Sequence, residues 1–185
     1  ASRGIGHATV KRFSTAGWRI ITCSRQPFAG DKCPWPAGEE DHIKDVVRSL
    51  GELGLWKIAM KPGKPLAFGQ VGETPFIGLP GNPASALVTC LVIARPFLLA
   101  SQGLEAVHTP AVSVPAGFSR EGESRAVYHR VRLEDGVLEL YPNQSSGILL
   151  SSCWASGLAV QEPGQAITRG DAVDYLPFSG FAWGV

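Results

Sequence analysis

Two short loops, each bounded by prolines and containing a glycine, most constrain how this chain can fold. The first is Lys61-Pro62-Gly63-Lys64-Pro65 and the second is Pro80-Gly81-Asn82-Pro83. Each follows a short apolar segment predicted to be a strand, at residues 55–60 and 76–79. The prolines fix the backbone of each loop, and the glycine lets a ligand come close. Loops that follow strands are where open α/β sheets bind their ligands.

The segment around these loops is predicted to be α/β. Glu39, Glu40 and Asp41 suit the start of a helix, where negative charge opposes the macrodipole. Apolar residues then recur at helical spacing from Ile43 to Leu53, which predicts one buried face. Residues 66–68 and 76–79 are predicted strands around a turn at Gly72.

A long apolar helix is predicted to follow the second loop. Asn82 is a good N-cap residue, and Pro83 falls at the first helical position, where a missing N–H costs nothing.

The last part of the chain is predicted to be all-β. Residues 127–133 and 137–141 flank Glu134-Asp135-Gly136, a turn sequence that indicates a hairpin. Residues 158–161 and 172–176 are predicted to be further short strands. Strands this short and this closely spaced indicate a small β-barrel or sandwich.

The two loops also carry charge that could hold an anion. Lys61 and Lys64 can neutralise an oxyanion, and Lys57 could add a third positive charge. Gly81 leads into a helix whose free amides favour anions. Such groups suit a phosphorylated or nucleotide-activated substrate, whose chemistry needs positioning and electrostatic stabilisation. The alternative is that these loops are ordinary turns with solvated lysines.

Composition excludes several other classes of protein. The 185 residues carry a net charge of +1, which gives no reason to expect nucleic acid as a partner. The four cysteines form no Cys-x-x-Cys pair, which argues against a metal cage and favours reduced thiols in a cytoplasmic protein. The longest apolar stretch, residues 84–100, is interrupted by Arg95-Pro96 and is too short to predict a membrane span. We therefore expect no membrane partner.

Two runs of sequence resemble a known family. Residues 56–69, Trp-Lys-Ile-Ala-Met-Lys-Pro-Gly-Lys-Pro-Leu-Ala-Phe-Gly, and residues 78–87, Gly-Leu-Pro-Gly-Asn-Pro-Ala-Ser-Ala-Leu, are similar to the signature of molybdopterin molybdenumtransferases. This family includes the C-terminal region of gephyrin. The resemblance extends upstream through residues 38–44 and more weakly to the C-terminus. It implies the C-terminal half of a molybdopterin-binding α/β domain over residues 38–103, then a small β-barrel-like domain over 104–185.

The resemblance also implies a reaction and its site residues. The family inserts molybdate into adenylylated molybdopterin with release of AMP and uses Mg²⁺, and its members commonly form homodimers. Asp41 would be catalytic and hold the metal, since hard cations prefer carboxylate oxygen, although it could simply be a helix N-terminal acid. Lys57 and Lys61 would be catalytic and face the phosphate, adenylate or molybdate. Substrate-binding positions would be Lys64, Pro80, Gly81, Asn82 and Pro83.

Polar residues of the last segment also match the family's small β-domain. Arg125, Arg130 and Gln144-Ser145-Ser146-Gly147 correspond to positions on the active-site side. The family usually has Gln-Gly-Ser there, so Ser145 departs from the pattern. The alternative is that these are strand-surface arginines and a serine loop.

Residues 1–37 resemble a different family. Ala1-Ser-Arg-Gly-Ile-Gly6 is similar to the glycine-rich turn of short-chain dehydrogenases, and a helix over 7–16 and a strand over 18–24 would complete a Rossmann-like αβ fragment. Arg25 would suit the phosphate of NADP. No tyrosine has a lysine four residues later, so the catalytic pair of that family is missing.

Three functions stay open at this point. The first is a molybdopterin molybdenumtransferase in a truncated chain. The others are a non-catalytic pterin-binding or dimerisation module and an NADP-dependent oxidoreductase.

Overall fold

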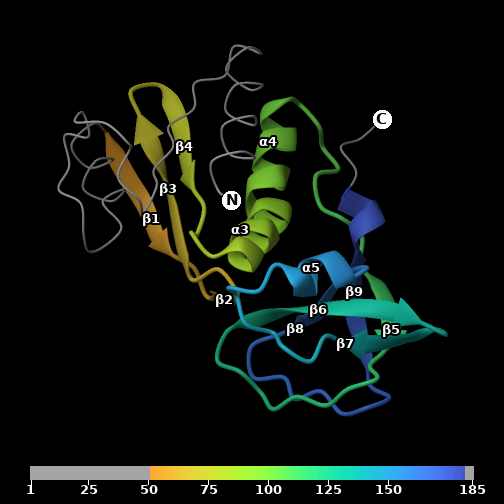
Figure 1. Ribbon diagram of the computed structural model, residues 1–185. Helices are drawn as coiled ribbons and strands as arrows, with labels where there is room; N and C mark the ends of the chain where they lie inside the picture. The colour runs from red at the N-terminus through yellow and green to blue at the C-terminus, as the bar shows by residue number, and fades with distance from the viewer. Residues whose placement is uncertain (1–50, 182–185) are drawn as a thin grey trace. The chain divides into compact units, whose positions relative to one another are not determined.

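The computed structural model describes residues 51–181, which all belong to the second of two units, Ala1–Asp45 and Val46–Val185 (Figure 1). The dehydrogenase-like turn, Asp41 and most of the helix predicted after it lie outside the described residues. That helix was predicted to extend to Leu53, which was wrong: Leu53 lies in a strand and pairs with Gly69. The described residues contain two β-sheets and one long helix.

A three-stranded antiparallel sheet contains β1 (Glu52–Lys57), β3 (Pro65–Val71) and β4 (Thr74–Gly78), in the order β1-β3-β4. The predicted turn at Gly72 is confirmed, and this glycine has a φ of 60° that L side chains rarely adopt. The predicted strand at 55–60 is interrupted after Lys57, where the Ile58 amide donates to the Lys64 carbonyl at 3.1 Å. The chain then enters the other sheet as β2 (Met60–Lys61).

The larger sheet has six strands. They are β2, β5 (Val112–Pro115), β6 (Ala126–Glu134), β7 (Val137–Leu140), β8 (Gly157–Gln161) and β9 (Ala172–Pro177). The order is β2-β6-β8-β9-β5, with β7 paired to β6, and only the β2–β6 pair is parallel. A bridge between Ala116 and Leu138 joins the chain after β5 to β7, so the sheet curls around its core.

The β6–β7 hairpin confirms the turn predicted from the sequence. Asp135 and Gly136 have φ values of 48° and 78°, which match a two-residue turn of the type that suits hairpin twist.

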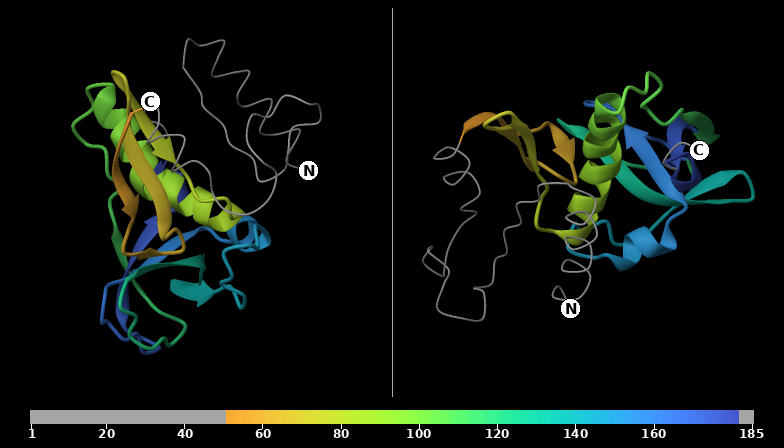
Figure 2. Two further views of the ribbon diagram at one scale, coloured as in Figure 1. Left: turned by 90° about the vertical axis from the view of Figure 1, so that its left-hand side faces the viewer. Right: turned by 90° about the horizontal axis from the view of Figure 1, so that it is seen from above.

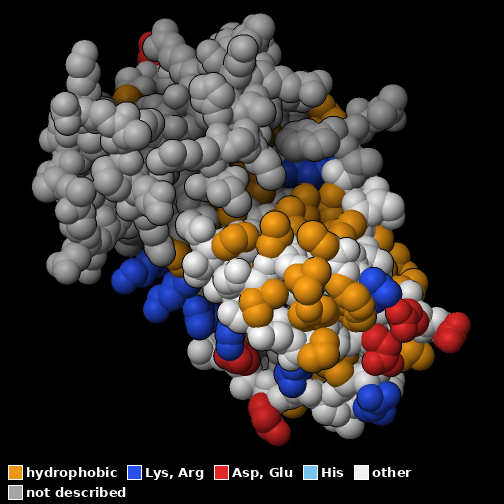
Figure 3. Space-filling view, viewed as in Figure 1, with side chains coloured by type: hydrophobic (Ala, Val, Ile, Leu, Met, Phe, Trp, Pro, Cys, Tyr) orange, Lys and Arg blue, Asp and Glu red, His pale blue; other side chains and the backbone are white. Residues whose placement is uncertain are grey.

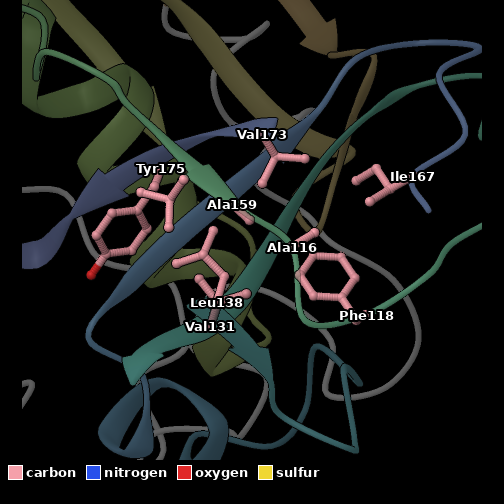
Figure 4. Packing of buried hydrophobic residues seen from close by; sticks show 9 residues of the cluster. Ala116, Phe118, Val131, Leu138, Ala159, Ile167, Val173 and Tyr175 are labelled. Carbon is pink, nitrogen blue, oxygen red and sulfur yellow. The ribbon is translucent and has the colours of Figure 1, made fainter. Parts of the chain in front are cut away.

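The core of the six-stranded sheet is shown in Figure 4. Val131 of β6, Leu138 of β7 and Ala159 of β8 have no exposed surface and lie together in this core. The other members are Val114, Ala116, Phe118, Ile167, Val173 and Tyr175. Alternate residues of β9 supply this core, as expected for a sheet with one buried face.

The long helix runs from Pro83 to Ser101 in three parts. These are α3 (Pro83–Thr89), the π-helical segment η1 (Cys90–Ala94) and α4 (Arg95–Ser101). It lies beside the three-stranded sheet in both views of Figure 2. The ring of Phe68 in β3 contacts that of Phe97 in α4 edge-on, with 5.4 Å between the ring centroids. The predicted positions of Asn82 at the N-cap and Pro83 in the first turn are confirmed, although the Asn82 side chain makes no cap hydrogen bond.

The predicted long helix is confirmed, and it continues through Arg95-Pro96. Pro96 lies in the first turn of α4, where its missing N–H is tolerated, and the buried Arg95 donates to the carbonyls of Phe181 and Val107, each at 3.0 Å. The 19-residue helix has a mean hydropathy of 1.8, so by length and composition it could cross a membrane. Core helices of soluble proteins can have the same length and composition.

A second buried cluster ties β2 to the helix. Met60 packs with Val88 of α3, Leu158 of β8 and Phe181 of the 3₁₀ turn η2 (Phe178–Phe181). This packing fixes the end of β2, where Lys61 begins the first proline-framed loop.

Candidate functional site

Lys61 is positioned by strand pairing and by the turn that follows it. As the last residue of β2 it lies opposite Val127 of β6, and the Lys61–Pro62 peptide bond is cis. Gly63 has a φ of 122°, and a Cβ there would collide with the Thr89 side chain of α3. The loop therefore packs closely on the helix, so the close approach at Gly63 that was expected of a ligand is made by Thr89.

The Lys61 side chain reaches an acidic partner that the sequence did not reveal. Its Nζ donates to Glu123 Oε1 at 2.7 Å, and the two side chains are 49% and 39% exposed. This bond and the lysine charge lower the pKa of the Glu123 carboxyl. Glu123 lies on the loop that precedes β6.

Beside this pair is a cavity of about 620 Å³. Its lining comes from the start of the first loop, the segment 119–123, strands β6 and β8, and the segment 166–168. Three cations line it, Lys61, Arg120 and Arg130, together with the acids Glu121 and Glu123. Figure 3 shows lysine and arginine side chains gathered on one side of the described surface, with acidic side chains next to them.

Arg130 is the most unusual of these cations because it is buried, with 2% exposure. Its Nε donates to Ser151 Oγ and its Nη2 to the Ser145 carbonyl, both at 3.3 Å. Burial lowers its pKa to about 10. Because Arg130 is buried, the strand-surface alternative for this residue was wrong. Within residues 51–181 no carboxylate lies in ion-pair contact with it. A buried guanidinium without a carboxylate favours a bound anion.

The 144–147 loop connects Arg130 to the second proline-framed loop. Gln144 exchanges hydrogen bonds of 3.0 Å with the backbone N–H and carbonyl of Arg130. On the other side, the Ser146 carbonyl accepts from the Ala84 amide, and Ser146 Oγ accepts from Asn82 Nδ2, both at 3.1 Å. The amides in the first turn of α3 were expected to be free to bind an anion. This expectation was wrong for Ala84, whose amide donates to Ser146.

A buried polar pair, His129 and Gln161, forms part of the cavity lining. The Gln161 amide donates to the carbonyls of Glu121 at 2.8 Å and Gln165 at 2.7 Å, so its oxygen is the acceptor for His129 Nε2 at 2.8 Å. His129 therefore carries its hydrogen on Nε2 in the neutral ring, and Nδ1 has no hydrogen-bond partner among residues 51–181. Burial lowers the pKa of His129, an effect that the hydrogen bond to Gln161 opposes and the nearby cations reinforce.

Of the remaining predicted residues, those that the structure describes do not line this cavity. Lys57 and Lys64 are exposed at the ends of β1 and β3, and neither lines the cavity. Pro80 is buried, whereas Gly81 and Pro83 are exposed before and at the start of α3. Asp41 lies outside the described residues. The site roles of all these residues stay predictions.

Arg120, Glu123, His129 and Gln161 were missed by sequence reasoning. They lie in unremarkable loop and strand sequence, and only long-range pairing brings them to Lys61.

Comparison with known proteins identifies the two halves of the described region. Residues 36–100 match the family model "Probable molybdopterin binding domain", and residues 114–178 match "MoeA C-terminal region (domain IV)". Residues 36–178 therefore correspond to a pair of domains from molybdenum cofactor biosynthesis.

Individual relatives show which proteins of this pathway the chain resembles. The molybdopterin molybdenumtransferase of Haemophilus influenzae is 50% identical over 66 residues, covering 36% of this chain. That of Nostoc is 30% identical over 139 residues, covering 69% of this chain. A crystal structure of the MoeA protein of Pyrococcus horikosii superposes with a TM-score of 0.64 at 27% identity, covering 73% of this chain. The chain thus contains a region corresponding to the C-terminal region of a molybdopterin molybdenumtransferase.

The same relatives show how much of such a protein is present. The chain spans 16% of the Haemophilus protein, 32% of the Nostoc protein and 34% of the Pyrococcus chain. A different protein, FixR of Bradyrhizobium diazoefficiens, is 70% identical over 44 residues, which is 24% of this chain.

Proposed function

We propose that this chain carries the C-terminal part of a molybdopterin molybdenumtransferase active site, in which an oxyanion binds beside Lys61 and Arg130. The reaction would insert molybdate into adenylylated molybdopterin and release AMP. The observation that carries the proposal is the buried Arg130, which has no carboxylate in ion-pair contact within residues 51–181 and borders the cavity that Lys61 lines.

The contacts of Arg130 suit it to hold an anion in a fixed place. Ser151 and the Ser145 carbonyl restrain its guanidinium before any ligand arrives, so little side-chain freedom is lost on binding. Molybdate and the phosphates of an adenylylated substrate are both tetrahedral oxyanions that a guanidinium can bind through two N–H groups. Lys61 would add a mobile charge at the open side of the cavity. Cleavage of the adenylate develops negative charge, which fixed cations stabilise.

Magnesium does not fit the described part of the site. Residues 51–181 contain no group of three or more His, Cys, Asp or Glu that could hold a metal ion, and the cavity cations would repel one. Asp41, the residue proposed to hold Mg²⁺, lies outside the described residues. We derive no step that depends on the metal.

The proposal also covers the localisation and the oligomeric state of the enzyme. By analogy with the family, the chain would work in the cytoplasm as a homodimer. Residues 1–37 would be a short-chain dehydrogenase-like addition that does not transfer hydride.

A non-catalytic pterin-binding or dimerisation module is the second candidate. In this case the Arg130 site would bind the adenylylated pterin without releasing AMP.

One assay separates these functions. The purified chain would be incubated with adenylylated molybdopterin, with and without molybdate, and AMP would be measured. Transferase activity predicts molybdate-dependent AMP release that Arg130→Met and Lys61→Ala reduce at least tenfold. The exposed Arg169, whose side chain makes no interaction with described residues, provides the control variant Arg169→Met.

Two other outcomes would change the assignment. Arg130-dependent binding of the adenylylated pterin without AMP release would identify the non-catalytic module. Absence of both binding and release would overturn the proposal, and protection by NADP against thermal unfolding would then support an oxidoreductase.

A further inference from the structure

Only one of the three cations that line the cavity is in an ion pair with a described residue. Lys61, Arg120 and Arg130 line it, yet within residues 51–181 the only ion pair that any of them makes is the 2.7 Å contact from Lys61 to Glu123. Glu121 also lines the cavity and is not in ion-pair contact with any described cation. Of the two carboxylates on this loop, only Glu123 is in an ion pair with a described residue, and its partner is the flexible side chain of Lys61.

The loop that carries Glu123 is held in place at several points. Arg120 and Ile167 exchange backbone hydrogen bonds of 2.7 and 2.8 Å, and the Gly164 amide donates to the Glu123 carbonyl at 2.7 Å. The Glu121 carbonyl accepts from the fully buried Gln161. The backbone at Glu123 is thus fixed on both sides, so its carboxylate is presented to Lys61 by the fold itself.

The ion pair and an oxyanion ligand would compete for the same ammonium group. A lysine at the cavity edge can neutralise a ligand only with N–H groups that it turns towards that ligand, and Glu123 Oε1 already accepts one of them. The carboxylate also places a negative charge at the cavity that repels an incoming anion.

We infer that Glu123 is an internal counter-anion of this cavity: it holds Lys61 while the cavity is free, and an oxyanion binds Lys61 by displacing it. Glu123 then acts as a selectivity residue. A monovalent anion gains too little from Lys61 to displace a carboxylate, whereas a divalent oxyanion such as molybdate or a phosphate ester gains more. The identity of the natural oxyanion rests on the proposed function, but the competition itself does not.

Anion binding to the full chain tests this inference directly. Inorganic molybdate and, separately, inorganic phosphate would be titrated into the wild-type chain, Glu123→Gln and the matched control Glu121→Gln by calorimetry. Exposed ion pairs are weak, so removing the competitor should tighten oxyanion binding by about two- to fivefold. Glu121→Gln removes the same charge from the same loop and should give a smaller gain, because Glu121 does not hold Lys61.

A double-mutant cycle separates competition from a general charge effect. Glu123→Gln should give no gain in a Lys61→Gln background, because the shared ammonium group is gone. In the wild-type chain, NMR titration should show that the pKa of Glu123, held low by Lys61, rises when molybdate is bound. A merely structural glutamate would show neither effect.

The inference is overturned if Glu123→Gln and Glu121→Gln change the affinity equally, if the gain persists without Lys61, or if no variant binds either oxyanion. These outcomes are independent of AMP release. Competition at Lys61 in a chain that releases no AMP would refute the enzymatic activity and leave the role of Glu123 standing.

Discussion

Replacing Gln161 by leucine should cost the protein a large share of its stability, although the two side chains have similar size. Gln161 has no exposed surface and makes three side-chain hydrogen bonds, to His129 and to the carbonyls of Glu121 and Gln165. Leucine can make none of them. A buried group left without its partner costs about 1–3 kcal/mol.

The size of the expected fall in the free energy of unfolding depends on which groups lose their hydrogen-bond partner. The Nε2–H of His129 is buried and would bear the full cost, whereas the carbonyls of Glu121 and Gln165 lie in loops where water can replace part of the loss. We therefore expect the free energy of unfolding to fall by about 2–5 kcal/mol. Urea denaturation of the full chain, followed by tryptophan fluorescence, measures this fall.

The matched control is Gln102→Leu. Gln102 is exposed at the end of α4 and its side chain makes no hydrogen bond to a described residue, so the free energy of unfolding should change by no more than about 0.5 kcal/mol. In Gln161→Leu, the amide of Gly164, which bonds to the Glu123 carbonyl, should also exchange its hydrogen faster. Equal effects of the two substitutions would refute the view that Gln161 holds the 119–123 segment.

Three further outcomes follow from the same structure. Gly63→Ala should destabilise more than Gly72→Ala by thermal denaturation, because both have positive φ but only at Gly63 does a Cβ collide with a neighbour; equal losses would contradict the close packing on Thr89. Burial lowers the folded-state pKa of His129 below 6.5, so the unfolded chain takes up a proton first and stability should fall as pH drops below about 6.5. His129→Gln should flatten this part of the pH profile of the urea midpoint, and an unchanged slope would exclude His129 as its source. Arg130→Met should abolish oxyanion binding in calorimetry. The free energy of unfolding should stay unchanged or rise, because a buried cation without a described carboxylate partner is costly. A large loss of stability would show that the bonds of Arg130 to Ser151 and Ser145 are chiefly structural.

Local sequence predicted the parts of the fold that local chemistry controls. The hairpin at Asp135-Gly136, the turn at Gly72 and the helix start at Asn82-Pro83 each depend on residues whose backbone preferences are strong. β5 was missed because its four residues, Val-Ser-Val-Pro, are too few to show a period. The long helix was predicted, and Pro96 does not end it because this proline falls in the first turn of α4.

The site was less predictable than the fold. Lys61 could be singled out because the glycine and prolines after it form a distinctive loop. Glu123 lies 62 residues away, and its pairing depends on the parallel alignment of β2 with β6. The burial of Arg130 could not be foreseen either, since a charged residue in a strand is usually on the exposed face.

The short strand β2 has a consequence for how this region could be divided in evolution or by engineering. Residues 36–100 and 114–178 match separate family models, which suggests two interchangeable modules. However, β2 belongs to the first match by sequence and to the sheet of the second by hydrogen bonding, at Met60–Ala126 and Lys61–Val127. Transplanting the second module alone would leave the edge of β6 uncovered and remove the lysine from its own cavity. Any natural recombination that preserves this site must therefore exchange both modules together, and a junction between residues 101 and 112 would separate the cation from the carboxylate that holds it.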